Sequence, residues 1–334
     1  MRSAISLVPS ATEIVVALGA GELLLGISAD CDQPDAELGP PLPVVTRPMI
    51  DPSLAAVDPA GVDAAVRDQM AAGGLLYSLD VETVVALAPD VVFAQDSCSV
   101  CALPSADVVA ALGRAGLSCE IVSLDPVDLE GVLATFSAVG LALGLKAEGA
   151  ALEASCRARL ERLGREAAHA GAGAHAGAVP HADAVLGVVV LDWVDPPFVA
   201  GNWVPDLVRA AGGEPLLSVA GQPSHQISID ELEASNPDLI VVAPCGLDLE
   251  AAQQHAGALK RALRARRMAA GAGSGAGTTS ARAAPARIVA FDGRLWFSRP
   301  GPRLVDGAEA LAAWLVGATP TGAVTSIEIT EATT

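Results

Sequence analysis

Four of the six cysteines stand where predicted β-strands end, a position from which thiolates could bind a soft metal ion. These four are Cys31, Cys98, Cys101 and Cys245. The Cys98–Cys101 pair has CxxC spacing, which is compatible with a zinc site, a redox site or neither. No second close pair completes a four-cysteine site, so free thiols are the favoured interpretation. A metal- or cofactor-dependent enzyme built on these cysteines remains the alternative function.

An aromatic-rich stretch runs from Trp193 to Trp203 and includes Phe198, in a chain with only 3% aromatic residues. Prolines and glycines in the same stretch predict a stiff loop. Rings on such a loop suit a flat, partly apolar ligand. The plain alternative is that the rings fill space beneath the loop. Binding is favoured by the polar residues among the rings, which are Asp192, Asp195 and Asn202.

Polar side chains also follow several other predicted strands. The candidate ligand contacts at these positions are Pro9, Ser10, Asp30, Arg47, Gln95 and Arg299. An arginine can hold a carboxylate or phosphate with two parallel hydrogen bonds. Surface ion pairing explains Arg47 and Arg299 equally well. Ser10 and Glu13 have the spacing of a capping box, which predicts that a helix starts at Ser10.

The elements that must position these residues follow an α/β pattern. Short β-rich apolar runs alternate with helical patterns, which is typical of parallel sheets. The expected strands span residues 4–8, 23–28, 43–45, 91–94, 119–124, 185–191, 238–243, 287–291 and 294–298. In open α/β sheets a ligand lies beyond the carboxyl ends of the strands, where the candidate residues stand.

The expected organisation has two α/β lobes. The N-terminal lobe covers residues 1–125, a helical connector with a long bridging helix covers 126–168, and the C-terminal lobe covers 185–318. Low-complexity insertions are expected at 169–184 and 271–285, and a flexible tail at 319–334.

Composition excludes several functions. The formal net charge of −19 excludes nucleic acid and an anionic membrane surface as partners, because both need concentrated positive charge. No apolar stretch is long enough to insert into a membrane. The sequence contains no Walker, zinc-protease or nucleophile-elbow motif. The first residues lack the pattern of a signal peptide, so a cytoplasmic location is expected, with export if the true start lies upstream.

The segments SLVPSATEIVVALG, GISADCDQP, LAPDVVFAQDSCSVCALP and LDWVDPPFVAGNWVPD resemble one protein family. It comprises cobalamin-binding proteins related to the periplasmic B12 carrier of ABC importers, a class III group of substrate-binding proteins, here in a signal-less subgroup. The resemblance implies two Rossmann-like lobes with central parallel sheets, joined by a long bridging helix. It also implies non-enzymatic binding of cobalamin or a related corrinoid in a cleft between the lobes. ABC-transporter components are the implied partners if the chain is exported.

The resemblance assigns ligand contact to Pro9, Ser10, Tyr77, Trp193, Phe198, Asn202, Trp203 and Arg299. The chain departs from subgroup members that have a histidine at the position of Asn202 and another near Ala29, which argues against metal coordination through imidazole. Haem is the weaker choice of ligand, because one tyrosine and few histidines supply little axial ligation. A third hypothesis is a subunit of a cytoplasmic complex whose cleft has lost its ligand.

Overall fold

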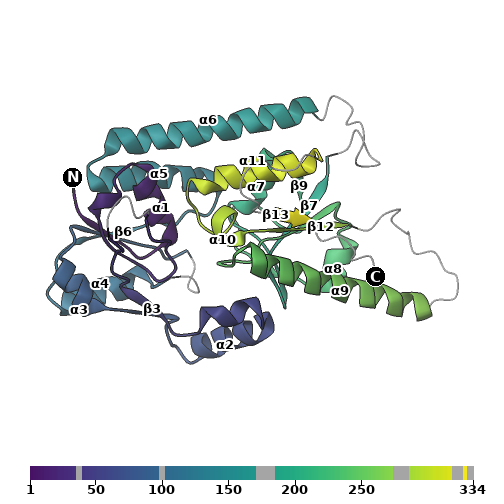
Figure 1. The fold of residues 1–334 in the computed structure, drawn as a ribbon, viewed down its shortest axis with the longest axis horizontal. Helices are drawn as coiled ribbons and strands as arrows, with labels where there is room; N and C mark the ends of the chain where they lie inside the picture. The colour runs from purple at the N-terminus through teal and green to yellow at the C-terminus, as the bar shows by residue number, and fades with distance from the viewer. Residues whose placement is uncertain (35–39, 98–101, 171–184, 274–285, 318–325, 329–334) are drawn as a thin grey trace. The chain divides into compact units, whose positions relative to one another are not determined.

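A computed structural model describes residues 1–34, 40–97, 102–170, 185–273, 286–317 and 326–328 (Figure 1). The chain forms two compact units. Unit 1 comprises Met1–Leu54, Gly61–Arg159 and Arg299–Pro302, and unit 2 comprises Ala55–Ala60, Leu160–Ser298 and Arg303–Thr334. Each unit therefore includes a short segment whose neighbours in sequence belong to the other unit.

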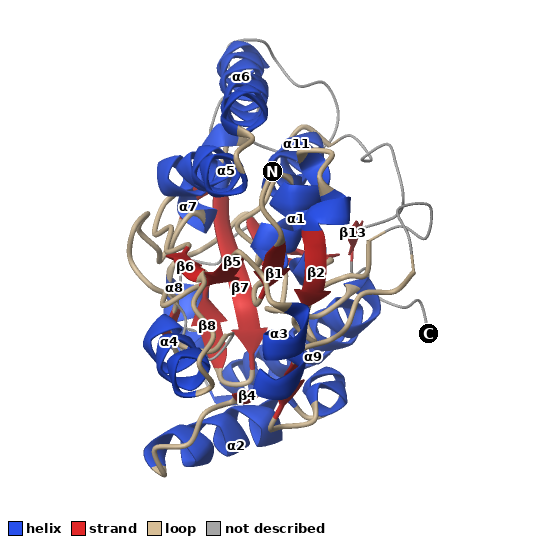
Figure 2. Ribbon diagram, turned by 90° about the vertical axis from the view of Figure 1, so that its left-hand side faces the viewer, coloured by secondary structure: helices blue, strands red, loops and turns tan. Residues whose placement is uncertain are grey.

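The main sheet of unit 1 is entirely parallel. It contains β1 (Ala4–Ser6), β2 (Leu24–Ile27), β5 (Val91–Ala94) and β6 (Glu120–Ser123) in the order β2-β1-β5-β6 (Figure 2). All residues of β1 and β5 are buried, as continuous apolar strands covered on both faces require. A separate antiparallel ribbon pairs β3 (Thr46–Pro48) with β4 (Tyr77–Leu79).

Local sequence signals explain where several helices of unit 1 begin. The Asp80 carboxylate accepts the Thr83 N–H at the start of α3 (Val81–Leu87), and Asp128 caps α5 (Leu129–Leu143) in the same way. The other helical elements are α1 (Pro9–Ala17), η1 (Gly21–Leu23), η3 (Pro52–Ala56), α2 (Pro59–Ala71) and α4 (Ser105–Arg114).

Helix α5 is followed directly by α6 (Lys146–Ala170), the helix in which the boundary between the two units falls. A Cβ added at Gly140 would lie 2.8 Å from the Gly149 Cα atom. Glycine at this position therefore allows the backbones of α5 and α6 to approach closely.

Unit 2 has a mixed sheet in the order β10-β8-β7-β11-β12-β13, with β9 paired to β7. Its parallel centre consists of β7 (Gly187–Val194), β11 (Leu239–Val242) and β12 (Arg287–Phe291). The short strands are β8 (Pro197–Val199), β9 (Glu214–Pro215), β10 (His225–Gln226) and β13 (Ser326–Glu328). The sheet core packs Val189, Leu191, Ile240 and Val242 against Ala252, Ala256 and Leu259.

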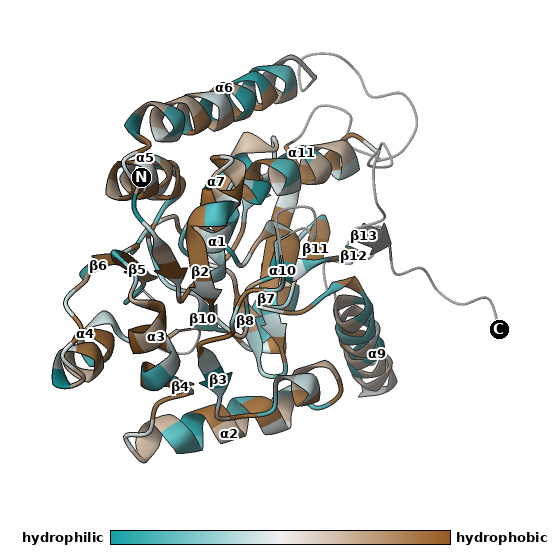
Figure 3. Cartoon of the chain, turned by 60° about the vertical axis from the view of Figure 1, so that its left-hand side comes forward, coloured by the Kyte–Doolittle hydropathy of each residue, from teal (hydrophilic) through white to brown (hydrophobic). Residues whose placement is uncertain are grey.

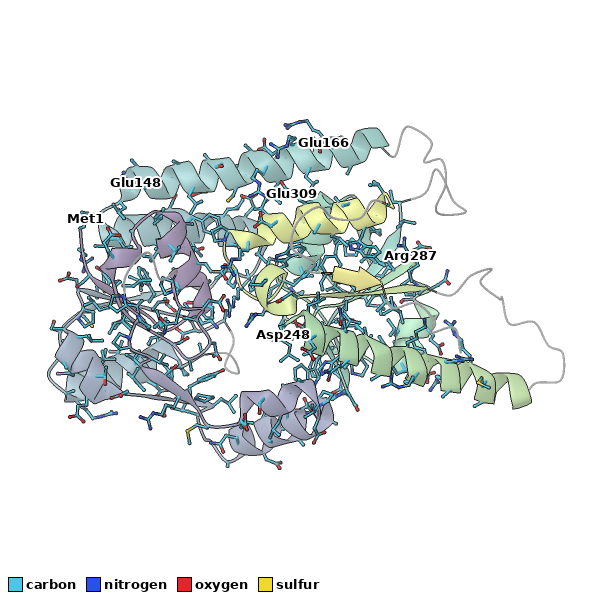
Figure 4. The ribbon with its side chains drawn as sticks, in the orientation of Figure 1. Met1, Glu148, Glu166, Asp248, Arg287 and Glu309 are labelled. Atoms are coloured by element: carbon cyan, nitrogen blue, oxygen red, sulfur yellow. The ribbon has the colours of Figure 1, made fainter. Side chains whose placement is uncertain are left out.

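The helices of unit 2 are α7 (Val204–Ala210), α8 (Ile229–Ala234), α9 (Leu249–Gly273), α10 (Gly293–Trp296) and α11 (Arg303–Leu315). Asp248, labelled in Figure 4, accepts the Ala251 N–H at the start of α9. In the part of α6 that belongs to unit 2, Arg162 pairs with Glu166 and with Glu309 of α11. Figure 3 shows polar and apolar residues mixed along α6, whereas β7 and β11 are largely apolar.

The prediction of an α/β fold with parallel central sheets is confirmed. The expected strand over 294–298 is wrong, because Asp292 accepts the Leu295 N–H and starts α10 there instead. The expected capping box at Ser10 is also wrong. Helix α1 begins at Pro9 with Val8 as its N-cap, and Ser10 lies inside the first turn.

The end of the chain differs from the expected flexible tail at three residues. Ser326–Glu328 form β13, which pairs antiparallel with β12. Residues 171–184 of the first expected insertion and 274–285 of the second lie outside the described residues, and α9 extends through Gly273. Among the helices that the structure describes, none is both long and apolar enough to span a bilayer.

Candidate functional site

The strand-end loops of unit 1 bring several predicted residues together. Pro9 is the first residue of α1, directly after β1, and the Ser10 side chain is only 3% exposed. The loop after β2 carries Asp30, whose carboxyl accepts a hydrogen bond from the Tyr77 hydroxyl. Burial raises the pKa of Asp30, while Tyr77 and the Arg299 charge act in the opposite direction. Tyr77 and Asp30 therefore form one polar pair at this edge of the unit.

Arg299 makes ion pairs and a hydrogen bond within the protein itself. Its Nη1 atom lies 2.6 Å from Asp32 Oδ2 and 3.3 Å from Glu13 Oε1, and its Nη2 donates to the Asp30 carbonyl at 2.6 Å. The Arg299 side chain is 8% exposed. These contacts tie the segment Arg299–Pro302 to the loop after β2, so the guanidinium supports the site rather than reaching out of it.

The remaining unit 1 candidates lie in different surroundings. Gln95, which follows β5, is 9% exposed. Arg47 is exposed in β3, opposite Ser78 of β4. Neighbouring Thr46 is buried, and its hydroxyl accepts the Ala29 N–H at 2.9 Å. The Arg47 side chain is therefore available to solvent, whereas Gln95 is buried.

The structure describes two of the four predicted metal ligands, Cys31 in unit 1 and Cys245 in unit 2. Cys31 Sγ accepts from the Thr12 hydroxyl at 3.1 Å and lies 3.2 Å from the Ser28 hydroxyl. Burial raises the pKa of Cys31, which favours the thiol over the metal-binding thiolate. Cys245 is exposed in unit 2. Cys98 and Cys101 lie outside the described residues, and the part that is described holds no group of three metal-binding side chains.

In unit 2 the aromatic block forms a hairpin at the end of β7. Trp193 pairs with Phe198 of β8, and the Asp195–Pro196 peptide bond between the two strands is cis. The Trp193 indole N–H donates to the carbonyls of Asp195 at 3.1 Å and Pro59 at 3.3 Å. Phe198 and Trp193 are both half-buried, so part of each ring remains accessible.

The other end of the block is structural. Trp203 is 8% exposed, and its indole N–H donates to the Phe297 carbonyl at 2.8 Å. Its ring therefore belongs to the core of unit 2. This agrees with the alternative that the rings of this stretch fill space beneath the loop. Asn202 is half-buried with φ of 51°, and its backbone N–H donates to the Gln222 carbonyl at 2.6 Å. Asn202 thus joins β8 to the 219–224 loop.

Asp192, named in the sequence only as a polar neighbour of the rings, has a defined role here. The Ser224 hydroxyl donates to Asp192 Oδ2 at 2.5 Å and accepts the Gly201 N–H at 3.1 Å. Burial raises the pKa of Asp192 to about 6, against the effect of the Ser224 hydrogen bond. The pair fixes the 219–224 loop beside the aromatic hairpin.

Sequence reasoning missed several partners of the candidate residues, which are Glu13 and Asp32 in unit 1 and Ser224 and His255 in unit 2. Glu13 was interpreted as part of a capping box, and Asp32, next to Cys31, was not among the candidate ligand contacts. His255 stacks edge-on against Trp193 with ring centroids 5.9 Å apart. No local signal identifies these partners, because each contact joins residues far apart in the sequence.

A family model described as a periplasmic binding protein matches residues 5–272, well over half of the chain. The chain belongs to the periplasmic binding protein family.

Solved structures with the same fold support the architecture of this periplasmic binding protein. A periplasmic heme-binding protein from Pseudomonas aeruginosa is 24% identical with a TM-score of 0.65, and the alignment covers 100% of this chain and 99% of that chain. The vitamin B12-binding protein BtuF of Vibrio cholerae is 19% identical with a TM-score of 0.59, covering 94% and 96%. The heme-binding protein RhuT from Roseiflexus sp. RS-1 is 21% identical with a TM-score of 0.60, covering 95% and 98%. No curated protein matches the chain.

Membership of a family of binding proteins makes solute binding the class of activity to explain. In this periplasmic binding protein the strand-end loops divide into two kinds of residue. Arg299, Trp203 and Cys31 make hydrogen bonds within the protein, and Ser10 is buried. Accessible groups that could meet a solute are Arg47, Tyr77, Trp193, Phe198 and Asn202.

Proposed function

We propose that this periplasmic binding protein binds a corrinoid of the cobalamin type without chemical conversion. Structural relatives are named for vitamin B12 or heme, both flat tetrapyrrole-type ligands. The half-buried rings of Trp193 and Phe198 supply apolar surface for the edge of such a macrocycle. Tyr77 and Asn202 supply polar contacts for its side chains, and Arg47 supplies a charge for an anionic group.

The choice of corrinoid over haem rests on the hydrogen bond between Tyr77 and Asp30. A tyrosine ligates haem iron as a phenolate, but the Tyr77 hydroxyl donates its proton to a carboxyl group. A carboxylate beside the phenol opposes loss of that proton, because two negative charges would then face each other. Cobalamin carries its own lower axial base and needs no ligand atom from the protein.

Titration of the purified protein with cobalamin, cobinamide and haem tests the proposal, with visible absorption and calorimetry as readouts. We expect saturable binding of one corrinoid per chain at micromolar concentrations or below. Phe198→Ala should weaken binding by about tenfold, because burial of an aromatic face contributes on the order of 1.5 kcal/mol. Met268→Ala removes a side chain that is 68% exposed on α9 and should leave affinity unchanged. The proposal fails if neither corrinoid saturates the protein, or if haem binds more tightly.

We further propose that the protein delivers its bound ligand for transport. Periplasmic binding proteins hand small molecules to ABC transporters, so we propose transporter components as partners if the chain is exported. The alternative proposal is a sequestering role in the cytoplasm. Mass spectrometry of the native N-terminus and fractionation of cells distinguish the two, since a processed chain outside the cytoplasm contradicts sequestration.

A further inference from the structure

Two hydrogen bonds anchor the segment Ala55–Ala60 to the rest of unit 2. His255 Nε2 lies 2.9 Å from the Ala55 carbonyl oxygen, near the start of the segment. The Trp193 indole N–H reaches the Pro59 carbonyl at 3.3 Å, near its end. The two anchoring rings also contact each other, edge to face at 85°. One histidine and one tryptophan therefore form a single clamp on this segment.

The surroundings of His255 fix its protonation state. The side chain is 2% exposed on the face of α9 that carries Ala252, Ala256 and Leu259 into the core. A carbonyl oxygen can only accept a hydrogen bond, so Nε2 carries the proton of the neutral ring. Nδ1 is buried and has no hydrogen-bond partner among the described residues. A second proton on the ring would place an N–H without an acceptor in the core.

We propose that His255 is a proton-operated latch, which in its neutral form holds the segment Ala55–Ala60 and orients the Trp193 ring, and which releases both when it is protonated. The buried imidazolium cannot satisfy Nδ1–H where it stands, so the ring must turn or move towards water. Either movement breaks the bond to Ala55 and the edge contact with Trp193. This inference goes beyond ligand binding, because its readouts need no ligand.

The direction of the pH effect follows from the causes that act on His255. Burial lowers the pKa of His255 below its ordinary 6.5, and backbone hydrogen bonds with Ala55 and Ala56 act in the opposite direction. The unfolded chain therefore binds this proton more readily than the folded chain. The latch contributes stability above the ordinary histidine pKa, and this stability is lost as the pH falls through the lowered value.

Other titratable groups stand on the elements that pack against His255. They are Asp58 in the clamped segment, Asp192 and Asp195 on the β7 hairpin, and Glu250 and Lys260 on α9. None of these charges contributes to the shift of His255. Asp192 needs its own control, because its pKa of about 6 places its titration in the same range of pH and it precedes Trp193.

Nuclear magnetic resonance of the full chain with labelled histidine and tryptophan tests the latch directly. His255→Gln and Trp193→Phe assign the two ring signals. We expect His255 to be the Nε2–H tautomer at neutral pH and to titrate below the ordinary pKa of a histidine. As the pH falls from the ordinary histidine pKa towards the lowered pKa of His255, the Trp193 indole N–H should exchange with water up to about tenfold faster for each pH unit, after correction for intrinsic rates, and the rate should level off below the lowered pKa.

Variants distinguish release of the latch from destabilisation of the whole protein at low pH. His255→Gln keeps a donor for the Ala55 carbonyl but takes up no proton, so it should remove the acid response of Trp193. Asp192→Asn and His225→Gln should both retain that response. The latch is overturned if His255 titrates like an exposed histidine, if His255→Gln still responds to acid, or if Asp192→Asn abolishes the response. The wild-type titration alone decides the matter if a variant does not fold.

Discussion

The side chain of Arg299 lies between the carboxylates of Asp32 and Glu13 with 8% of its surface exposed. A guanidinium buried to this degree is stable only because charged and carbonyl oxygens surround it. Asp30 supplies the carbonyl, so three residues from the first lobe hold one from near the end of the chain. Arg299 is therefore one of the side chains that hold the loop after β2, together with Thr46 and Thr12.

Replacing Arg299 should therefore be costly. In Arg299→Leu the Glu13 carboxylate, itself 8% exposed, loses its counter-charge. We expect the free energy of unfolding to fall by roughly 3–5 kcal/mol, measured by urea denaturation at pH 7. Arg67→Leu removes an exposed ion pair with Asp63 and should cost about 0.5 kcal/mol or less. Equal losses in the two variants would refute the structural role of Arg299.

The sequence locates the site residues better than it assigns their roles. It places Asp30 after a strand, where the structure has it, whereas Arg299 follows α10 and Trp193 lies within β7. Tyr77, which only the family resemblance indicated, is the first residue of β4. The sequence does not reveal that the Arg299 and Trp203 side chains bind other groups of the protein. Their partners, Asp32 and the Phe297 carbonyl, are distant in the sequence. Ser10 shows the same limit, since Pro9 in the first turn of α1 moved the helix start and left Ser10 buried.

At the scale of elements, the join between β8 and the 219–224 loop is unusually tight. A Cβ added at Gly201 would lie 2.3 Å from the Gln222 carbonyl oxygen and 2.5 Å from the Pro223 carbonyl carbon. Both neighbours are backbone atoms, so neither can move without moving the loop. The hydrogen bonds of Asn202 and Ser224 depend on this approach.

Gly201→Ala should displace the loop and lower the melting temperature. We expect a loss of about 2 kcal/mol or more, since strain is added and the Asp192–Ser224 contact is broken. Thermal unfolding followed by circular dichroism measures the effect. Gly113→Ala is the matched control, because a Cβ there meets nothing within 4 Å and alanine favours a helix by up to about 1 kcal/mol. An unchanged melting temperature in Gly201→Ala would contradict the tight join.

The strands could be predicted because buried parallel strands are mainly continuous apolar runs. β5 and β11 are apolar and buried throughout, whereas β7 also contains the half-buried Asp192 and Trp193. The run over 294–298 also contains apolar residues, but its first three residues lie in α10. There the preceding Asp292 provides a helix cap, and a Cβ added at Gly293 would lie 2.2 Å from the Pro244 carbonyl oxygen. Composition alone does not distinguish a short strand from a single helical turn.

At the scale of the whole molecule, neither unit is a continuous piece of sequence. Unit 1 needs Arg299–Pro302, and unit 2 needs Ala55–Ala60. Lobes with continuous boundaries were expected from the sequence, because contacts between distant segments leave no trace in composition or periodicity.

A fragment of residues 1–159 should therefore be less stable than unit 1 within the full chain. It contains Glu13 and Asp32 but lacks Arg299, and its segment 55–60 lacks Trp193 and His255. We expect it to unfold at a lower urea concentration, followed by far-ultraviolet circular dichroism. If the fragment and the full chain unfold at the same urea concentration, then Arg299–Pro302 and the contacts of Ala55–Ala60 contribute little to stability.

The exchanged segments also constrain how such a protein can change over generations. Glu13 and Arg299 are 286 positions apart, yet each is the buried counter-charge of the other. A single crossover inside α6 would take Glu13 and Asp32 from one parent and the residue at position 299 from the other. Lineages that alter one of these positions should therefore alter the other, and chimeras of two relatives should survive best when all three stretches of a unit come from the same parent.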